Sequence, residues 1–352
     1  MLQGYSLKRV DLRSDTVTQP TDEMRAVMAA ARVGDDVFGE DPSVIELQNR
    51  MAALLGKEAG LFVPSGTMSN AIAIRTHTQP GDEIVTEASS HIYLYEGGGY
   101  AALSGCSIAL VPSQSGIMNA TEVVQKIRKS ANGKSHYPNG TLISIENTSN
   151  RGGGTCYSQA VIDEIAGVAQ EQDCALHMDG ARLFNAVAAT GVDVKRMVKD
   201  CDTISICISK GLGAPVGGVL VGSKKIIEQA HRWRKMFGGG MRQAGVLAAA
   251  GLYALEHNRE RLMEDHRRAY QLAESLNEVD GLEVDLNLVQ TNMIYLRTES
   301  SAEGVVKQLG EEGIDLLAIE SNLIRLVTHL HIGDEDIDNT IYAFRKVFAP
   351  VN

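Results

Sequence analysis

Short apolar runs alternate with longer segments of helical spacing through the first two thirds of the chain. Six of these runs are expected to be strands because each is brief, apolar and bounded by turn residues. They lie at residues 82–86, 108–112, 142–146, 175–179, 203–208 and 218–222. The alternation predicts an α/β fold in which helices cover a mostly parallel sheet.

Residues 159–172 show why helices are expected between these strands. Ser158 offers a capping hydroxyl, and Val161, Ile162, Ile165 and Ala169 recur at helical spacing after it. The segment is therefore predicted to be an amphipathic helix.

The C-terminal part of the chain follows a different pattern. An alanine-rich segment at 244–255 precedes a charged helix expected over 258–277. Strands are expected at 291–297 and 324–330, with helices between and after them. We interpret this part as a smaller α+β domain. The predicted division places an N-terminal arm and a large domain in residues 1–250 and the small domain in residues 251–352.

Lys210 follows the apolar run 203–208, with Ser209 between them, and precedes Gly211 and Gly213. The end of a buried strand removes water from an amine, and glycines let a bulky group approach the backbone. An isolated lysine beside glycines is more often a solvated loop residue. The position nevertheless favours an amine that forms a Schiff base with an aldehyde cofactor.

Asp179 ends another predicted strand, and it makes the Lys210 signal more specific. Ligands of open α/β sheets bind outside the carboxyl ends of the strands, so Asp179 and Lys210 can meet in one crevice. A carboxylate there can keep a pyridine nitrogen protonated, as pyridoxal 5'-phosphate (PLP) requires of its protein partner. An isolated aspartate would more simply be a helix cap or turn former.

Ser65, Gly66 and Thr67 form a small-residue turn between a short strand and an apolar helix. Backbone N–H groups and hydroxyls at a helix N-terminus bind phosphate well. Ordinary helix capping explains the same residues and, for this turn alone, is the simpler interpretation.

Composition agrees with a soluble metabolic enzyme. The 352 residues can bury a large core, and a net charge of −11 argues against a nucleic-acid surface. Neither a membrane-spanning stretch nor a signal peptide is recognisable, so we expect no membrane association and a cytoplasmic location. The five cysteines lack C-x-x-C spacing, which favours buried thiols over disulfides or zinc.

Further motifs follow in a fixed order along nearly the whole chain. They are DLRSDT at 11–16, GDDVFGEDP at 34–42, SGTMSN at 65–70, SHIY at 90–93, ENT at 146–148, HMDGAR at 177–182, SKGLGAP at 209–215, GGGMRQ at 238–243 and RLVTH at 325–329. With these motifs the chain resembles the low-specificity L-threonine aldolases, a PLP-dependent family of aspartate-aminotransferase fold type I. The resemblance implies a mostly parallel, seven-stranded sheet in the large domain and retro-aldol cleavage of β-hydroxy-α-amino acids to glycine and an aldehyde.

The resemblance also implies roles for individual residues. Arg325, assisted by Ser14, is expected to hold the substrate carboxylate, since a planar guanidinium suits that task. Arg182 is expected to face either the phenolic oxygen of the cofactor or the same carboxylate. Lys210, Asp179 and the Ser65–Gly66–Thr67 turn are expected to bind the cofactor.

Two histidines and one arginine complete the expected site. His91 resembles the histidine that stacks on the cofactor ring, and His136 resembles a second histidine near the substrate hydroxyl. Arg242 resembles an arginine that reaches a phosphate across a subunit boundary, and Lys235 is either its companion or an ordinary solvated lysine. A shared site of this kind implies a homotetramer, a dimer of dimers.

Some features point elsewhere or depart from the family pattern. A PLP-dependent racemase or β-eliminating lyase could use the same lysine. A nucleotide-binding oxidoreductase is suggested only by Gly97–Gly98–Gly99, which follows no clear strand. His329 and His331 lack a third metal ligand, so no metal site is expected. Phe38, Ser149 and His331 replace residue types common in the family, which leaves the preferred substrate side chain open.

Overall fold

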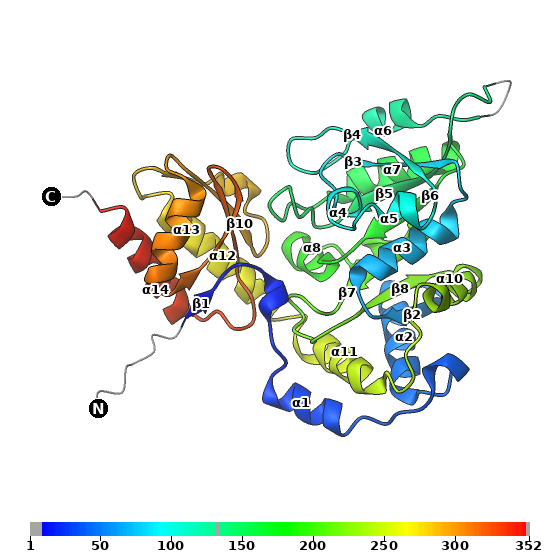
Figure 1. The fold of residues 1–352 in the computed structure, drawn as a ribbon, viewed down its shortest axis with the longest axis horizontal. Helices are drawn as coiled ribbons and strands as arrows, with labels where there is room; N and C mark the ends of the chain where they lie inside the picture. Colours follow the sequence, from blue (N-terminus) through cyan, green and yellow to red (C-terminus); the bar gives the residue numbers. More distant parts are fainter. Residues whose placement is uncertain (1–8, 131–133, 350–352) are drawn as a thin grey trace.

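The computed structural model describes residues 9–130 and 134–349 (Figure 1). The segment 1–8, on which the expectation about a signal peptide rests, lies outside the described residues. Among the described helices, none combines the length and the apolar character needed to cross a membrane.

The elements follow one another in the predicted alternation. The strands are β1 (Val10–Asp11), β2 (Ala59–Val63), β3 (Asp82–Glu87), β4 (Ser107–Val111), β5 (Asn139–Glu146), β6 (Ala175–Asp179), β7 (Thr203–Cys207), β8 (Gly218–Gly222), β9 (Leu282–Glu283), β10 (Met293–Thr298), β11 (Ile314–Asp315), β12 (Leu317–Glu320) and β13 (Leu323–Val327). The helices are α1 (Asp22–Ala29), α2 (Pro42–Leu55), α3 (Gly66–His77), α4 (His91–Leu94), α5 (Gly99–Ala102), α6 (Ala120–Lys126), α7 (Gln159–Glu171), α8 (Leu183–Thr190), α9 (Val194–Met197), α10 (Lys224–Met236), α11 (Gly245–His257), α12 (Leu262–Leu276), α13 (Ala302–Glu311) and α14 (Asp334–Val347). Short 3-10 turns are η1 (Asp15–Val17), η2 (Asp36–Phe38) and η3 (Leu286–Leu288).

A seven-stranded sheet in the order β2-β8-β7-β6-β5-β3-β4 forms the centre of the large domain. The pairs from β7 through β4 are parallel, and β8 runs antiparallel to both of its neighbours. The α/β fold with a mostly parallel sheet is confirmed, and each of the six predicted strands is present. Because β6 and β7 are parallel neighbours, their carboxyl ends meet at one edge.

Side chains that alternate along β2 show how the sheet is covered on both faces. Leu61 and Val63 pack in a cluster with residues of α3 and α10, whereas Phe62 packs in the larger cluster that includes α2 and α7. Neighbouring residues of a strand point to opposite faces, so a strand buried on both sides is apolar throughout. This explains why the strands appear in the sequence as continuous apolar runs.

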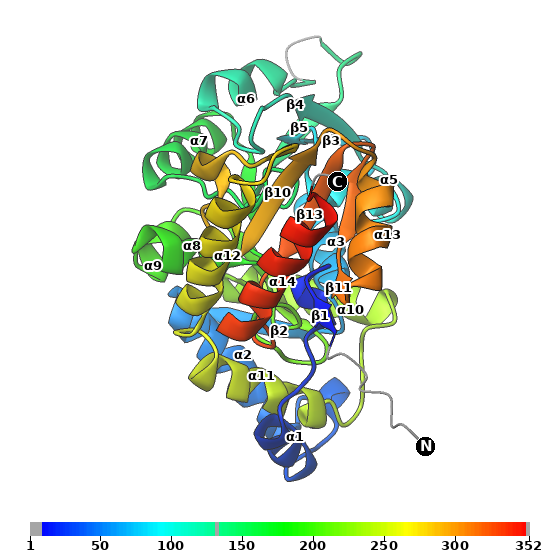
Figure 2. The same ribbon diagram turned by 90° about the vertical axis from the view of Figure 1, so that its left-hand side faces the viewer.

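The small domain contains the four-stranded sheet β12-β13-β10-β9 and lies to one side of the large domain (Figure 1). Figure 2 shows α13 and α14 in front of β10 and β13. The N-terminal arm joins this domain, since β1 pairs with β11 and Val10 and Leu12 lie in its apolar cluster. The arm is thus packed against the small domain rather than the sheet of the large one. The boundary near residue 250 stays a prediction.

Helix ends follow local chemistry. The hydroxyl of Ser158 accepts a hydrogen bond from the Val161 N–H and begins α7 where predicted. The helix expected from residue 258 begins only at Leu262, because Asn258 ends α11 and its side-chain amide donates to the carbonyl of Leu212. That bond ties the inter-helix turn to the loop after Lys210.

Candidate active site

A cavity of about 350 Å³ lies at the carboxyl ends of β6 and β7. Lys210 and Asp179 both line it, as do His91 and the turn before α3. The full lining is Thr16, Pro64, Ser65, Gly66, Thr67, Asn70, His91, Glu96, Asp179, Ala181, Cys207, Ser209, Lys210, Pro215, Val216 and Gly217. The structure thus brings Lys210 and Asp179, which the sequence placed after two strand ends, to one cavity.

The loop that presents Lys210 is short and tightly bonded. The N–H of Gly213 donates to the carbonyl of Lys210 at 2.8 Å, and Gly213 has a φ of +78°, which favours glycine. The hydroxyl of Thr18 in the N-terminal arm donates to the same carbonyl at 3.0 Å. The backbone of Lys210 is thus fixed from the large domain and from the arm.

The turn before α3 is a helix cap that also faces the cavity. The Ser65 hydroxyl accepts from the Met68 N–H at 3.1 Å, so the capping interpretation is correct. Gly66 has no room for a side chain, because a Cβ atom there would lie 2.4 Å from Cys207 Sγ. The phosphate role of Ser65, Gly66 and Thr67 stays a prediction, although a helix N-terminus at this place suits an anion.

Asp179 is buried and receives hydrogen bonds on both carboxylate oxygens. The N–H of Ala181 donates to Oδ1 at 3.1 Å, and the Asn70 amide donates to Oδ2 at 2.8 Å. The same Asn70 nitrogen donates to Glu96 Oε1 at 2.8 Å. Such bonds stabilise the charged form of a carboxylate.

His91 lies next to this pair. Its Nδ1 is 2.9 Å from Glu96 Oε1. Burial lowers the pKa of His91, but the hydrogen bond with Glu96 and the charges of Asp179 and Glu146 outweigh it and raise the pKa overall. The ligand atoms of His91, Glu96 and Asp179 lie within 4.8 Å of one another, yet Asn70 N–H groups already bind both carboxylates.

Glu146 is a second buried carboxyl at the same sheet edge, opposite Asp179 in the β5–β6 register. Its two oxygens accept the backbone N–H groups of His91 at 2.7 Å and Asn150 at 2.9 Å. Burial and the nearby charge of Asp179 raise the pKa of Glu146 to about 7. The hydrogen bonds to both oxygens fix the Glu146 carboxyl beside the backbone of His91, which lines the cavity.

Arg182 is held by a carboxylate that the sequence did not indicate. Its Nε and Nη2 each donate to one carboxylate oxygen of Asp15 in the N-terminal arm, at 2.7 Å for each bond. Burial lowers the pKa of Arg182, but the charge of Asp15 and its hydrogen bonds outweigh this and raise the pKa overall. The role of Arg182 toward cofactor or substrate stays a prediction.

Arg325 lies on β13, and its side chain bridges three parts of the chain. It donates to Asn150 Oδ1 at 3.3 Å and to the Arg13 carbonyl at 3.1 Å. Its Nε is buried and makes no hydrogen bond within the described residues. Arg325 is not part of the cavity lining, and its role toward the substrate carboxylate stays a prediction. Ser14, next to Arg13, caps η1 by accepting from Thr16.

His136 is not brought together with the other residues. It is exposed and precedes β5, whereas Glu146 ends that strand. The length of β5 separates the two by roughly 23 Å at the usual rise of a strand. His136 is not part of the lining of this cavity, so its role near the substrate hydroxyl stays a prediction and would require the cavity of a neighbouring copy.

Arg242 and the histidine pair also lie outside the cavity lining. Arg242 is 63% exposed and pairs with Asp35 at 3.1 Å. His331 Nε2 contacts the backbone of Gln19, and His329 Nε2 contacts the Asp11 carbonyl at 2.8 Å. These histidines connect the arm to the small domain.

Sequence reasoning missed Asp15, Asn70, Glu96 and Glu146. Asn70 and Glu146 lie inside motifs that had been recognised, SGTMSN and ENT. Only the fold shows that Asn70 and Glu96 line the cavity, that Glu146 bonds to the backbone of His91, and that Asp15 pairs with Arg182.

Comparison with known proteins agrees with this geometry. The β-eliminating lyase family matches residues 11–299. A probable low-specificity L-threonine aldolase 2 from Arabidopsis thaliana is 43% identical over 99% of both chains. A low-specificity L-threonine aldolase from Escherichia coli is 42% identical over 97% of this chain and 99% of the relative.

The chain belongs to the low-specificity L-threonine aldolase family, within the β-eliminating lyases. Solved structures agree on the fold. A threonine aldolase from Leishmania major superposes with a TM-score of 0.82 at 18% identity, covering 97% of this chain and 100% of that one. A putative L-allo-threonine aldolase from Listeria monocytogenes gives 0.80 at 20% identity and 96% coverage of both.

This aldolase family is PLP-dependent, and the cavity fits that cofactor. An amine, a buried carboxylate and a helix N-terminus face one space, and Gly66 leaves the turn bare of a side chain. Lys210 would hold the aldehyde carbon, Asp179 the ring nitrogen and the start of α3 the phosphate. The carboxylate complements a protonated ring nitrogen, the helix N-terminus complements a phosphate, and the amine is the nucleophile for the aldehyde.

Proposed function

We propose that this chain cleaves L-threonine, L-allo-threonine and related β-hydroxy-α-amino acids to glycine and an aldehyde, with PLP as cofactor. The observation that carries the proposal is the meeting of Lys210 and Asp179 in one cavity. Curated relatives named low-specificity L-threonine aldolase, similar over nearly the full length, support the reaction.

PLP, when bound, supplies an electron sink for the bond that breaks at Cα. The residues of the chain select that bond by orienting the substrate. We assign the substrate carboxylate to Arg325, with Ser14 and Arg182 nearby, because a planar guanidinium binds a carboxylate through two parallel bonds. Lys210 binds the cofactor and is the amine available for proton transfer at Cα.

His91 is the group that we assign to the β-hydroxyl. It lines the cavity, and its pKa is raised by its carboxylate neighbours after the opposing effect of burial. Its Nδ1 bonds to Glu96, which leaves Nε2 to face a ligand. A proton taken from the β-hydroxyl at Nε2 would release the aldehyde.

Low specificity follows from a pocket that holds the carboxylate and the ring but leaves the β-substituents loosely constrained. A methylene or an inverted centre at Cβ would change the barrier by roughly 1–3 kcal/mol. That is enough for a preference between threonine and allo-threonine and too little for exclusion.

We also propose a cytoplasmic homotetramer in which Arg242 reaches the phosphate of a partner's PLP. The exposed guanidinium of Arg242 and the neighbouring Phe38, which is 73% exposed, support a covered surface there. The backbone N–H of Asp36, two residues before Phe38, donates to the Arg242 carbonyl and ties the two segments together.

Glycine and acetaldehyde should form when the PLP-loaded protein is incubated with the L-threo or L-allo isomer, and not with the D isomers. Lys210→Ala should lose this turnover while retaining some PLP, and borohydride reduction should label Lys210 in the unsubstituted protein. Racemised threonine without aldehyde, or ammonia with an oxo acid, would instead assign the chain to racemases or eliminating lyases. Light scattering on the same preparation tests the assembly.

A further inference from the structure

Asn70 on α3 is a buried amide that joins two carboxylates. Its Nδ2 donates one hydrogen to Asp179 Oδ2 and the other to Glu96 Oε1, both at 2.8 Å. An ionised carboxylate only accepts hydrogen bonds, so a single charged partner is enough to fix the orientation of the amide. Its oxygen must therefore face away from the cavity, toward His177.

His177 on β6 bonds to this amide oxygen, and its hydrogen bonds allow only one tautomer. Asn70 Oδ1 can only accept, so the His177 Nε2, 3.1 Å away, must bear the proton. Burial lowers the pKa of His177 to about 4, which makes the ring neutral at neutral pH and leaves Nδ1 as an acceptor. The Thr203 hydroxyl on β7, 2.9 Å from Nδ1, must donate to it.

His77 at the end of α3 is the last member of this series of hydrogen bonds. Its Nε2 lies 3.0 Å from Thr203 Oγ1, whose own hydrogen is already directed to His177. His77 must therefore donate. We call His77, Thr203, His177 and Asn70 the Asn70 chain: each member donates to the next, and the last donor meets Asp179. Asn70, His177 and Thr203 are all buried.

The direction of these bonds matters because three carboxyl groups share a small space. Asp179 and Glu96 bind the same amide, and Glu146 lies opposite Asp179 in the neighbouring strand. Repulsion among like charges favours protonation of at least one of them. The two N–H groups of Asn70 offset this repulsion for Asp179 and Glu96 in particular.

We propose that Asn70, oriented by His177 and Thr203, is a positioning residue that holds the Asp179 carboxylate through a hydrogen bond and turns it toward the cofactor ring nitrogen. The same amide also donates to Glu96, which bonds to His91 Nδ1, so Asn70 fixes the position of His91 relative to Asp179. This inference rests on the proposed function, because it assigns the ring nitrogen of PLP to Asp179. Neither Thr203 nor His177 lines the cavity, so both would act only through Asn70.

Asn70→Leu tests the proposal by removing both donors at similar size. The lost bond to a charged acceptor should weaken PLP binding by at least about tenfold, measured by titrating apoprotein with PLP. The NMR shift of isotope-labelled ring nitrogen should show loss of the ring proton at lower pH than in the unsubstituted protein. Ser69→Ala is the matched control, because this buried hydroxyl on the same helix makes no hydrogen bond within the described residues.

A second pair of variants keeps the test independent of folding at position 70. Thr203→Val removes the hydroxyl that orients His177, whereas Thr203→Ser retains it. The valine variant should shift the ring-nitrogen titration in the same direction as Asn70→Leu, by less, and the serine variant should restore it. Wild-type PLP affinity and titration in both Asn70→Leu and Thr203→Val would overturn the Asn70 chain.

Asp179→Asn separates this inference from the function on which it rests. A shifted ring-nitrogen titration in Asp179→Asn together with wild-type behaviour of the Asn70 and Thr203 variants would overturn the inference alone. An unshifted titration in Asp179→Asn would remove the assignment of Asp179 and the inference with it. Glycine and acetaldehyde production, measured separately, reports on the reaction itself.

Discussion

Two aspartates of this chain have buried side chains and bidentate arginine partners, yet their pKa values move in opposite directions. Asp15 of the N-terminal arm binds Arg182 beside the cavity, and Asp265 binds Arg261 in the first turn of α12. The pKa of Asp15 is well below its usual range, whereas the pKa of Asp265 is raised.

The surroundings of the two pairs explain the difference. Burial raises the pKa of both aspartates, but for Asp15 the charge and hydrogen bonds of Arg182, with Lys210 nearby, outweigh it. For Asp265, burial outweighs Arg261. The Arg182 side chain is 5% exposed and that of Arg261 is 21% exposed, so water screens the second cation more.

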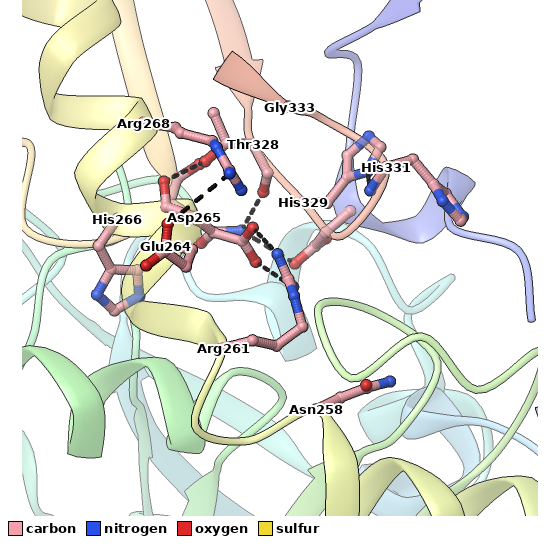
Figure 3. Close-up of polar contacts among 12 residues, drawn as sticks. Asn258, Arg261, Glu264, Asp265, His266, Arg268, Thr328, His329, His331 and Gly333 are labelled. Carbon is pink, nitrogen blue, oxygen red and sulfur yellow. Dashed lines mark hydrogen bonds and ion pairs between the residues drawn. The ribbon is translucent and has the colours of Figure 1, made fainter. Parts of the chain in front are cut away.

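Figure 3 shows the second pair at the start of the small domain, where Arg261 points at Asp265 and the Thr328 hydroxyl reaches the same turn. This pair is local, one helical turn apart, whereas Asp15 and Arg182 join segments far apart in the sequence. A local pair stabilises a helix end. A distant pair holds the arm beside the cavity, which the neighbouring residues Thr16 and Ala181 line, so its loss affects fold and site together.

The largest effect is expected for Asp15→Asn. Arg182 would remain buried without its counter-charge, which typically costs about 3–5 kcal/mol of stability. The arm residue Thr16 lines the cavity, so PLP retention should fall as well. Urea unfolding and PLP titration measure the two losses.

Arg13→Ala is the matched control for that prediction. Arg13 and Asp11 form an exposed ion pair on the same arm, and such pairs contribute about 0–1 kcal/mol. If Asp15→Asn were no more destabilising than Arg13→Ala, the buried pair would not be what holds the arm.

Asp15 also shows what the sequence could and could not predict. Strands and strand-end residues were predictable because apolar runs are local signals and parallel strands end at one edge. Lys210 and Asp179 were found in that way. Asp15 lies in a recognised motif, but its partner Arg182 is distant in the chain, and no local pattern indicates such a pairing.

Other differences have equally physical causes. His136 was expected near the substrate from the family resemblance, but it precedes β5 and lies outside the lining of this cavity, so its role stays a prediction. The predicted helix starts too early, at residue 258, because the sequence does not show that the Asn258 side chain donates to the distant carbonyl of Leu212 and ends a helix. Asn70 appears in the sequence only as the last residue of the SGTMSN motif, because its two carboxylate partners lie on other parts of the chain.

An intermediate effect is expected for Arg261→Met at the second pair. Methionine keeps the apolar stem and removes the charge, leaving Asp265 buried without its cation. We expect a loss of about 2 kcal/mol, less than for Asp15→Asn, because Asp265 can take up a proton. The loss should shrink as the pH falls, and urea unfolding at several pH values checks this. A loss that is constant with pH would show that Asp265 stays charged.

The smallest effect is expected for Asp265→Asn, the same substitution as at Asp15 but in the screened pair. Because the folded-state pKa of Asp265 is raised, the folded protein binds this proton more tightly than the unfolded chain does. Wild-type stability contributed by this group is therefore full at low pH and declines as pH rises through the folded-state pKa. Asparagine mimics the protonated form and keeps an acceptor for Arg261, so the change in unfolding free energy should stay within about 1 kcal/mol.

The stability of Asp265→Asn relative to wild type should be higher at alkaline than at acidic pH. A loss as large as that of Asp15→Asn would mean that Arg261, despite its partial exposure, depends on a full counter-charge, and the contrast between the two pairs would disappear.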